Sequence, residues 1–425
     1  MSKAKKINNG YHFGTYDHQL VVDENKVVTR TMIVLKYQNI PVYFTNFDKY
    51  VSQKPIKFME SNSKLPMKYI CRFLNFCYFE EHKIRCLRDI DDEMIISFLQ
   101  KYAACSLSGD TAETVRSTGS VNRCVNTVLN FINNLKKYQY TPNVDWHNIY
   151  RTQKKINTKT RKVENVEQIA FEVRVKQQCD RITFRDIPEE AFQIIMGIIR
   201  DKHQNIMMLA ALGAFAGLRP SEACNVRRPE YGGIRFQMNG DIVTNVFINL
   251  KEEVKLRSDD VAVGGIKKHR VARVYPSFVK IFVEFYNEYI EYIEGKKFET
   301  EYGPLSTNRK GMAITYSSYA QEFKKVLLEA KEIMAKSDNP RIQLYAQMLN
   351  VHSFGPHIFR HWFTVKLVQN DENVSTIMFY RGDKNPNSAT TYLQNKSELI
   401  KQLENVEDAL FDYSMYLAEG IYGRH

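Results

Sequence analysis

The stretch GPHIFRHWFTVKLVQNDENVSTIMFYRGDKNPNSATTYLQNK, residues 355–396, decides how the second half of the chain is expected to fold. Its first part has the apolar spacing of a helix, on which His357 and Arg360 share one face because they are three residues apart. The side chains expected to anchor that face in the core are Ile358, Phe359 and Trp362. Tyr392 follows ten residues after Gly382. Because the chain contains 25 tyrosines, Tyr392 is of interest only through these neighbours.

Another arginine stands at the end of an apolar run. The segment from Met207 to Leu218 is the longest such run and is predicted to be a buried helix. Arg219 follows it directly, and the end of a buried helix can aim a rigid guanidinium fork at an anion. The alternative is a surface arginine paired with Glu222, which is the better interpretation when this motif is considered alone.

The composition indicates which classes of partner are favoured. The 425 residues include 60 Lys and Arg against 48 Asp and Glu, which gives a formal net charge of +12. Such an excess favours a polyanionic partner, nucleic acid first and an anionic membrane second, although a basic enzyme without either has the same composition. The longest apolar run is shorter than the roughly 18–20 residues that span a bilayer, so we expect no membrane association.

Cysteine and histidine spacing argues against a disulfide framework or a metal. The seven cysteines include no C-x-x-C pair, and the N-terminus lacks a signal-peptide core, so we expect reduced thiols and a cytoplasmic protein. His357 and His361 are four residues apart, but no glutamate follows the first and no third ligand is evident. No phosphate-binding G-x-x-x-x-G-K-[ST] loop occurs, so neither a metal nor a nucleotide cofactor is expected.

Apolar periodicity divides the chain into regions. Two β-type runs, TMIVLKY and PVYFTNF, lie near the N-terminus, and three segments between residues 64 and 138 have helical spacing. The expected regions are a small β-rich segment at 1–52, a helical domain at 53–145, a basic linker at 146–180 and a second domain at 181–425 with a C-terminal helix.

The basic linker has two interpretations of equal weight. Residues 151–162 hold six Lys or Arg and no acidic residue. They form either a solvated connection or a clamp on the DNA backbone, since lysine and arginine neutralise phosphates. The residues proposed to bind DNA are Lys154, Lys155, Arg161 and Lys162.

Three separate motifs carry a family resemblance. AGLRPSE at 216–222, HIFRHWF at 357–363 and YRGDKNPNSATTY at 380–392 together resemble, in order and spacing, the motifs of the tyrosine recombinase, or phage integrase, family. The match covers about residues 180–400, and the helical region before it resembles the family's core-binding domain in arrangement only. The resemblance implies a mainly α fold with a small antiparallel sheet in the catalytic domain (α+β), preceded by a helical core-binding domain.

The resemblance also implies roles in cutting a DNA phosphodiester. Arg219 and Arg360 would stabilise charge on the nonbridging oxygens as the phosphorane forms. Tyr392 would attack in line and leave a 3′-phosphotyrosyl ester. His357 would act as general base toward the tyrosine or donate a hydrogen bond to the phosphate, and Glu222 would brace this group.

In the family, a lysine on a β-hairpin protonates the 5′ leaving oxygen. Lys268 is favoured over Lys267 because it precedes Pro276 by eight residues, as such a lysine often does in relatives. Lys251 and Lys255 stay open because the insertion between the strands makes this hairpin unusually long.

Asp383 departs from the family pattern. It stands where the family usually has a histidine or tryptophan after the glycine, and a carboxylate there should repel the scissile phosphate. Either it points away and braces a neighbour, capping the next turn through backbone N–H groups, or the site is weakened or regulated. Lys384 or His361 would then fill the gap.

These implications amount to a site-specific DNA recombinase that integrates or excises a bacterial mobile element or phage. Double-stranded DNA is the expected partner, with a tetramer on paired sites and an accessory DNA-bending protein as a further candidate. The C-terminal helix packs either on its own core or on a neighbouring protomer. The rivals are a type IB topoisomerase-like enzyme and a non-catalytic DNA-binding protein on a decayed recombinase fold.

Overall fold

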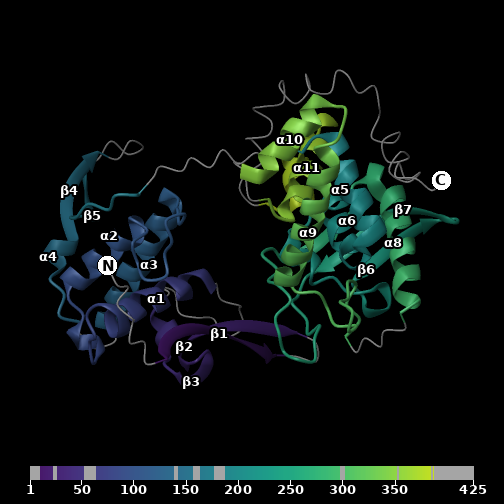
Figure 1. Cartoon of the computed structure of the whole chain (residues 1–425). Helices are drawn as coiled ribbons and strands as arrows, with labels where there is room; N and C mark the ends of the chain where they lie inside the picture. The colour runs from purple at the N-terminus through teal and green to yellow at the C-terminus, as the bar shows by residue number, and fades with distance from the viewer. Residues whose placement is uncertain are drawn as a thin grey trace. The chain divides into compact units, whose positions relative to one another are not determined.

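The computed structural model of the chain describes residues 10–22, 26–51, 64–137, 142–156, 163–176, 187–296, 302–351, 354–383 and 386. The chain divides into two compact units (Figure 1). The first comprises Met1–Leu20 and Thr29–Ile182, and the second comprises Val21–Val28 and Thr183–His425. Among the residues described, no helix combines the length and apolar composition needed to cross a bilayer.

The N-terminal region is a three-stranded sheet in the order β1-β2-β3. Its strands are β1 (Tyr11–Val21), β2 (Val27–Tyr37) and β3 (Ile40–Phe44). Gln38 and Asn39 join β2 to β3 with φ of 47° and 71°, the left-handed geometry that matches the twist of a tight hairpin. The sequence predicted β2 and β3, which meet at this turn, whereas it did not predict β1.

Helices form the core of the first unit. They are α1 (Lys64–Asn75), α2 (Asp92–Ala103), α3 (Thr118–Lys137) and α4 (Trp146–Ile149). Asp91 begins α2 by accepting a hydrogen bond from the backbone N–H of Met94 at 2.8 Å. The apolar face predicted for α3 is at most 3% exposed at each of its positions, namely Val121, Val125, Val128, Leu129 and Ile132. The predicted helical packing of this region is therefore confirmed.

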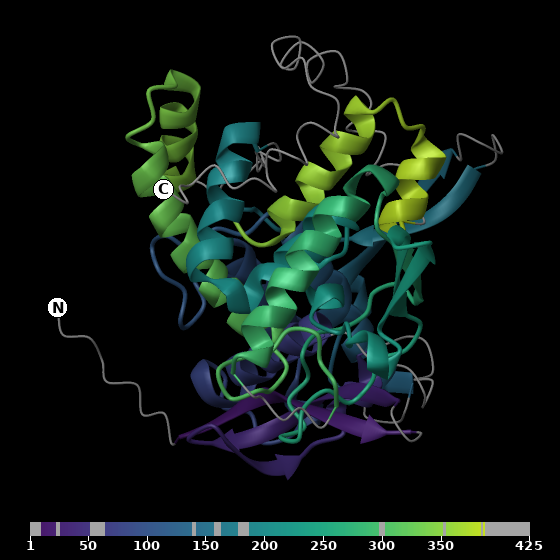
Figure 2. The ribbon, with the colours of Figure 1, turned by 90° about the vertical axis from the view of Figure 1, so that its right-hand side faces the viewer.

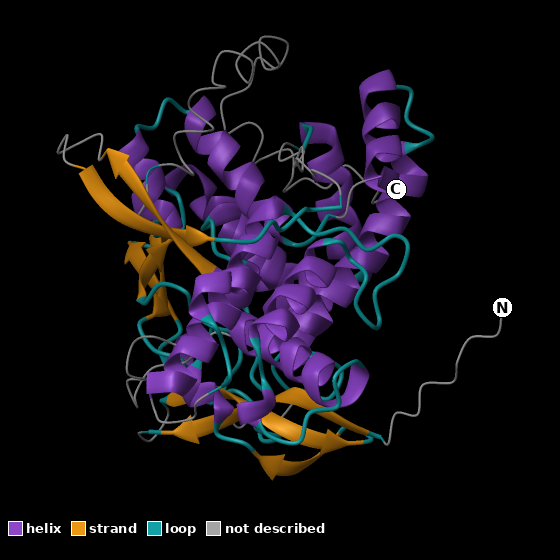
Figure 3. Cartoon of the chain, turned by 90° about the vertical axis from the view of Figure 1, so that its left-hand side faces the viewer, coloured by secondary structure: helices purple, strands orange, loops and turns teal. Residues whose placement is uncertain are grey.

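Part of the expected linker is instead a β-hairpin. Strands β4 (Tyr150–Ile156) and β5 (Val163–Ile169) pair antiparallel, with Tyr150 opposite Ile169 (Figures 1 and 3). At the base of the hairpin, Tyr150 stacks on Trp146 with ring centroids 5.8 Å apart. Polar residues occupy most positions of these strands, so apolar alternation did not predict them. The hairpin is held by backbone pairing more than by a buried face.

The described residues of the second unit form mainly helices and a small sheet (Figure 2). Its strands are β6 (Ile234–Asn239), β7 (Ile242–Leu250) and β8 (Arg270–Arg273), paired antiparallel in that order. Its helices are α5 (Glu189–Lys202), α6 (Met207–Phe215), α7 (Pro220–Ala223), α8 (Val279–Glu294), α9 (Tyr316–Met334), α10 (Pro340–Val351), α11 (His357–Gln369) and α12 (Val374–Arg381). A mainly helical fold with small antiparallel sheets is thus confirmed.

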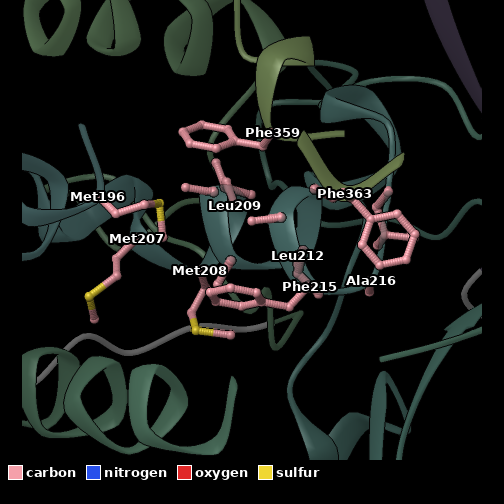
Figure 4. Close-up of a cluster of buried hydrophobic side chains, with 14 of the residues drawn as sticks. Met196, Met207, Met208, Leu209, Leu212, Phe215, Ala216, Phe359 and Phe363 are labelled. Atoms are coloured by element: carbon pink, nitrogen blue, oxygen red, sulfur yellow. The ribbon is translucent and has the colours of Figure 1, made fainter. Parts of the chain in front are cut away.

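Helix α6 is the centre of this unit. Every residue from Met207 to Phe215 is buried, because helices cover it on several sides. Figure 4 shows that α11 places Phe359 and Phe363 against α6 side chains such as Leu209. Trp362, also on α11, stacks on Phe192 of α5 with ring centroids 3.9 Å apart. The packing fixes α11, and therefore its polar face, relative to the end of α6.

Candidate active site

A glycine turn places Arg219 beside α11. After α6 ends, Gly217 adopts φ 62°, a conformation that residues with a side chain rarely take. A Cβ atom there would lie 2.5 Å from the ring of Phe363, so only glycine fits against α11. The chain then turns into the short helix α7, with Arg219 as its N-cap residue and proline in the first position.

Glu222 braces Arg219. Its carboxylate accepts hydrogen bonds from the backbone N–H of Arg219 at 3.2 Å and from its guanidinium at 3.0 Å. Its Oε2, which accepts the backbone N–H of Arg219, also accepts from Arg270 of β8 at 3.2 Å. Burial raises the pKa of Glu222, but the charges of Arg270 and Arg219 together lower it by more. The net pKa is therefore below the ordinary value. The buried carboxylate is therefore charged and holds both arginines.

Arg360 reaches the same place from α11. It is 4% exposed, and its Nη1 donates to the carbonyl oxygens of Gly217 and of Arg381, the latter at 2.9 Å. Its Nη2 donates to Asp383 at 2.9 Å. Burial, followed by repulsion from Arg381 and Arg219, lowers the pKa of Arg360 to about 9. The guanidinium is still charged at neutral pH.

Three arginines meet on the carboxylate of Asp383. Its Oδ1 accepts from Arg219 at 2.6 Å and from Arg360 at 2.9 Å, and its Oδ2 accepts from Arg381 at 2.8 Å. All four side chains are at most 14% exposed. Burial raises the pKa of Asp383, but the three arginines lower it below its ordinary value. The two arginines singled out from the sequence thus converge on one anionic oxygen.

Gly382 aims Asp383 into this cluster. It ends α12 with φ 64°, and the N–H groups of Gly382 and Asp383 bond to the carbonyls of Phe379 and Met378. A Cβ atom at Gly382 would lie 2.5 Å from the guanidinium of Arg270. The left-handed helix end therefore favours glycine, and any side chain there would also displace Arg270.

His357 is the exposed first residue of α11, on the side of Arg360. Burial of part of the ring, together with Arg360, Arg219 and Lys267, lowers its pKa below the ordinary 6.5. The imidazole is therefore neutral at pH 7. A neutral ring can accept a proton, as a general base must.

Two candidate lysines lie in the loop that enters β8. Lys268 is half-buried, and its carbonyl oxygen accepts from Arg270 at 3.1 Å. Lys267 is exposed and is one of the charges that lower the pKa of His357, so it lies near that ring. Lys255 instead pairs with Asp260 at 2.8 Å. The loop brings Lys267 and the backbone of Lys268 to the site. The choice of the catalytic lysine among Lys267, Lys268, Lys251 and Lys255 stays a prediction.

Several predicted site residues lie outside the described residues. These are Tyr392, Lys384, Arg161 and Lys162, together with the C-terminal helix expected after Tyr392. Lys154 is exposed on β4, and Lys155 follows it on the same strand. His361 is half-buried on α11, one turn beyond His357.

Sequence reasoning missed Arg270 and Arg381. Arg381 bonds the hydroxyl of Thr364 at 2.6 Å as well as Asp383. Arg270 donates to the carbonyl oxygen of Lys268 and to Glu222. One signal was available, because an arginine and an aspartate flank Gly382 in the sequence RGD. Buried opposite charges on either side of a left-handed glycine are expected to pair.

No protein-family model and no curated protein matches the sequence. Among solved structures, the chain is similar to the XerH site-specific recombinase bound to palindromic difH substrate, with 16% identity over 80% of this chain and 79% of that one, at a TM-score of 0.45. The Tn1549 transposon integrase in complex with a circular intermediate DNA is 14% identical over 81% and 93%, at a TM-score of 0.46. The XerA recombinase is 14% identical over 81% and 91%, at a TM-score of 0.33. The chain is thus similar to tyrosine recombinases of known structure. Because these TM-scores are below 0.5, its function is inferred from the residues of the site.

Proposed function

We propose that the chain is a site-specific DNA recombinase that cleaves and rejoins strands through a 3′-phosphotyrosyl ester, integrating or excising a mobile element. The observation that carries this proposal is the convergence of Arg219 and Arg360 on a single anionic oxygen at 2.6 and 2.9 Å. Two planar guanidiniums from different parts of the chain, aimed at one anion, are suited to a phosphate whose charge grows in the transition state.

The proposed reaction has two linked proton transfers. The Tyr392 oxygen attacks phosphorus and passes its proton to neutral His357, while the bond from phosphorus to the 5′ oxygen breaks. Lys268 donates the proton that the leaving 5′ oxygen takes up. Arg219 and Arg360 stabilise the phosphorane oxygens, which is the role that metal ions have in other phosphoryl-transfer enzymes. Since the ester conserves the bond energy, the reverse attack by a 5′ hydroxyl rejoins the strand.

The remaining parts of the chain have proposed roles in binding DNA. The helical region 53–145 is the core-type DNA-binding domain, and residues 181–425 form the catalytic domain. The β4–β5 hairpin, which occupies much of the basic 146–180 region, contacts the phosphate backbone through Lys154 and its basic neighbours. The N-terminal β-rich region 1–52 is proposed to act together with the helical domain in binding DNA. On paired sites the protein acts as a tetramer.

The test is a nicked suicide substrate built from the DNA that flanks the gene. We expect a covalent protein–DNA adduct with the wild-type chain and none with Tyr392→Phe, which removes one hydroxyl and should leave DNA binding intact. An adduct on any plasmid DNA, with relaxation by a monomer, would support the topoisomerase-like rival. Specific DNA binding without an adduct would support the non-catalytic rival.

A further inference from the structure

The Asp383 carboxylate occupies the position that the proposed reaction assigns to a phosphate. Its Oδ1 is held by Nη2 of both Arg219 and Arg360, at 2.6 and 2.9 Å. These are the donors that would bind the nonbridging oxygens, and a carboxylate and a phosphate take the same kind of guanidinium hydrogen bond. Both arginines therefore already have an anion within the protein.

We propose that Asp383 is a built-in occupant of the phosphate-binding site, which a DNA phosphate must displace from Arg219 and Arg360 before strand cleavage. This inference rests on the proposed function for the identity of the entering phosphate. Asp383 thus has a positioning and gating role. It keeps Arg219 and Arg360 aligned while no DNA is bound.

Arg381 supplies a place for the displaced carboxylate. It binds Oδ2 at 2.8 Å, whereas the other two arginines bind Oδ1. Its own guanidinium is fixed by the hydroxyl of Thr364 at 2.6 Å, and Thr364 lies on α11. When a phosphate takes the Oδ1 position, Asp383 can keep its bond to Arg381 and thus stay paired, which limits the cost of a buried charge.

Charge balance supports this exchange. Arg219 is also paired with Glu222, whereas Arg360 otherwise donates to two carbonyl oxygens in the bonds described above. An entering phosphate would therefore meet a negative carboxylate between the two guanidiniums and bind only weakly until that carboxylate moves. Neutralising Asp383 without changing its shape should open the site to anions.

Inorganic phosphate is the probe, because it reports the anion site without DNA cleavage. Isothermal titration calorimetry in chloride buffer should show that Asp383→Asn binds phosphate at least tenfold more tightly than the wild-type chain. Asp241→Asn makes the same change of charge at an exposed turn of the same unit, and its affinity should equal that of the wild type. Adding Arg219→Gln to Asp383→Asn should remove the gain.

Equal phosphate affinity in Asp383→Asn and the wild type would overturn the proposal, as would a gain that persists after Arg219→Gln. If Asp383→Asn unfolds in chloride buffer, refolding is followed by circular dichroism against added phosphate, with Asp383→Ser as a second variant. Rescue by phosphate supports the proposal, and no rescue of either variant contradicts it. Because no step uses Tyr392, failure of the recombinase proposal would appear separately, as a missing DNA adduct.

Discussion

At the scale of single residues, the site depends on three arginines that come from different elements. Arg219 precedes α7, Arg360 lies on α11 and Arg381 ends α12, yet all three bind Asp383. The sequence identified the first two because each lies in a motif on a predicted helix. It could not identify the cluster, because Asp383 and Arg219 are 164 residues apart and no periodicity relates them. The predicted cap by Asp383 concerns the turn that follows it, most of which lies outside the described residues, so it stays a prediction.

Removing the Asp383 charge should destabilise the second unit. Asp383→Ala leaves the buried Arg360 without its counter-charge, so the free energy of unfolding should fall by about 3–5 kcal/mol in phosphate-free buffer. This exceeds the loss of about 1 kcal/mol that a helix cap alone would cause. Urea unfolding of wild type and variant at pH 7 measures it, and a loss near 1 kcal/mol would favour the cap.

The same pair of proteins should show a defined pH dependence. The pKa of Asp383 is lower in the folded chain than its ordinary 3.8, so the unfolded chain takes up the proton first as the pH falls. The contribution of Asp383 is thus complete above pH 3.8 and is lost as the pH falls through the folded pKa. The stability difference between wild type and Asp383→Ala should therefore shrink between pH 4 and pH 2; a constant difference would contradict the charge-based account.

Lys268 is expected to be the general acid. Lys268→Ala should slow single-turnover cleavage by about 10²–10⁴, and a substrate with a 5′-bridging sulfur should restore the rate because its leaving group needs no proton. Lys267→Ala is the matched control and should cleave both substrates at similar rates. Since Lys267 lowers the pKa of His357, its removal should instead move the acidic limb of the pH–rate profile upward. Sulfur rescue confined to Lys267→Ala would reverse the assignment.

At the scale of elements, apolar periodicity predicted the helices well and the β-structure unevenly. Helices α1, α2, α3, α6 and α11 were expected because each has a continuous apolar face. Strands β2 and β3 were expected from their β-branched and aromatic runs. Strand β1 and the β4–β5 hairpin were missed, since their pairing depends on partners rather than on a strict alternation of apolar residues.

The hairpin should bind the DNA backbone without reading bases. Changing Lys154, Lys155, Arg161 and Lys162 to glutamine should weaken binding to specific and random DNA equally. The slope of log K against log salt should decrease by about 0.9 for each lost phosphate contact. The control changes four lysines of the second unit to glutamine, namely Lys310, Lys324, Lys331 and Lys336. Weakening confined to the specific site, or an equal effect in the control, would argue against a backbone clamp at the hairpin.

At the scale of the whole molecule, assembly is expected to depend on the C-terminal region, which lies outside the described residues. A chain that ends at Lys396 keeps Tyr392 but lacks the apolar stripe at Leu399, Ile400, Leu403, Val406 and Leu410. It should bind a single half-site normally and fail to form tetramers on paired sites. The reason is that no apolar helix face is left to pack on a neighbouring protomer. Light scattering of the protein–DNA complexes measures this. Tetramers of the shortened chain would place the stripe in its own core.

The identity of the nucleophile tests the account at all three scales. In this account one tyrosyl–DNA bond is formed with the help of the arginine cluster, the helices that carry it and the assembled complex. After trapping on a nicked suicide substrate and digestion with trypsin and nuclease, mass spectrometry locates the phosphorylated residue. We predict a nucleotide linked to Tyr392 and none linked to Tyr380, whose ring is 8% exposed and packs against Tyr275 with centroids 5.3 Å apart. A nucleotide on Tyr380, or an adduct that forms undiminished in Tyr392→Phe, would contradict the account.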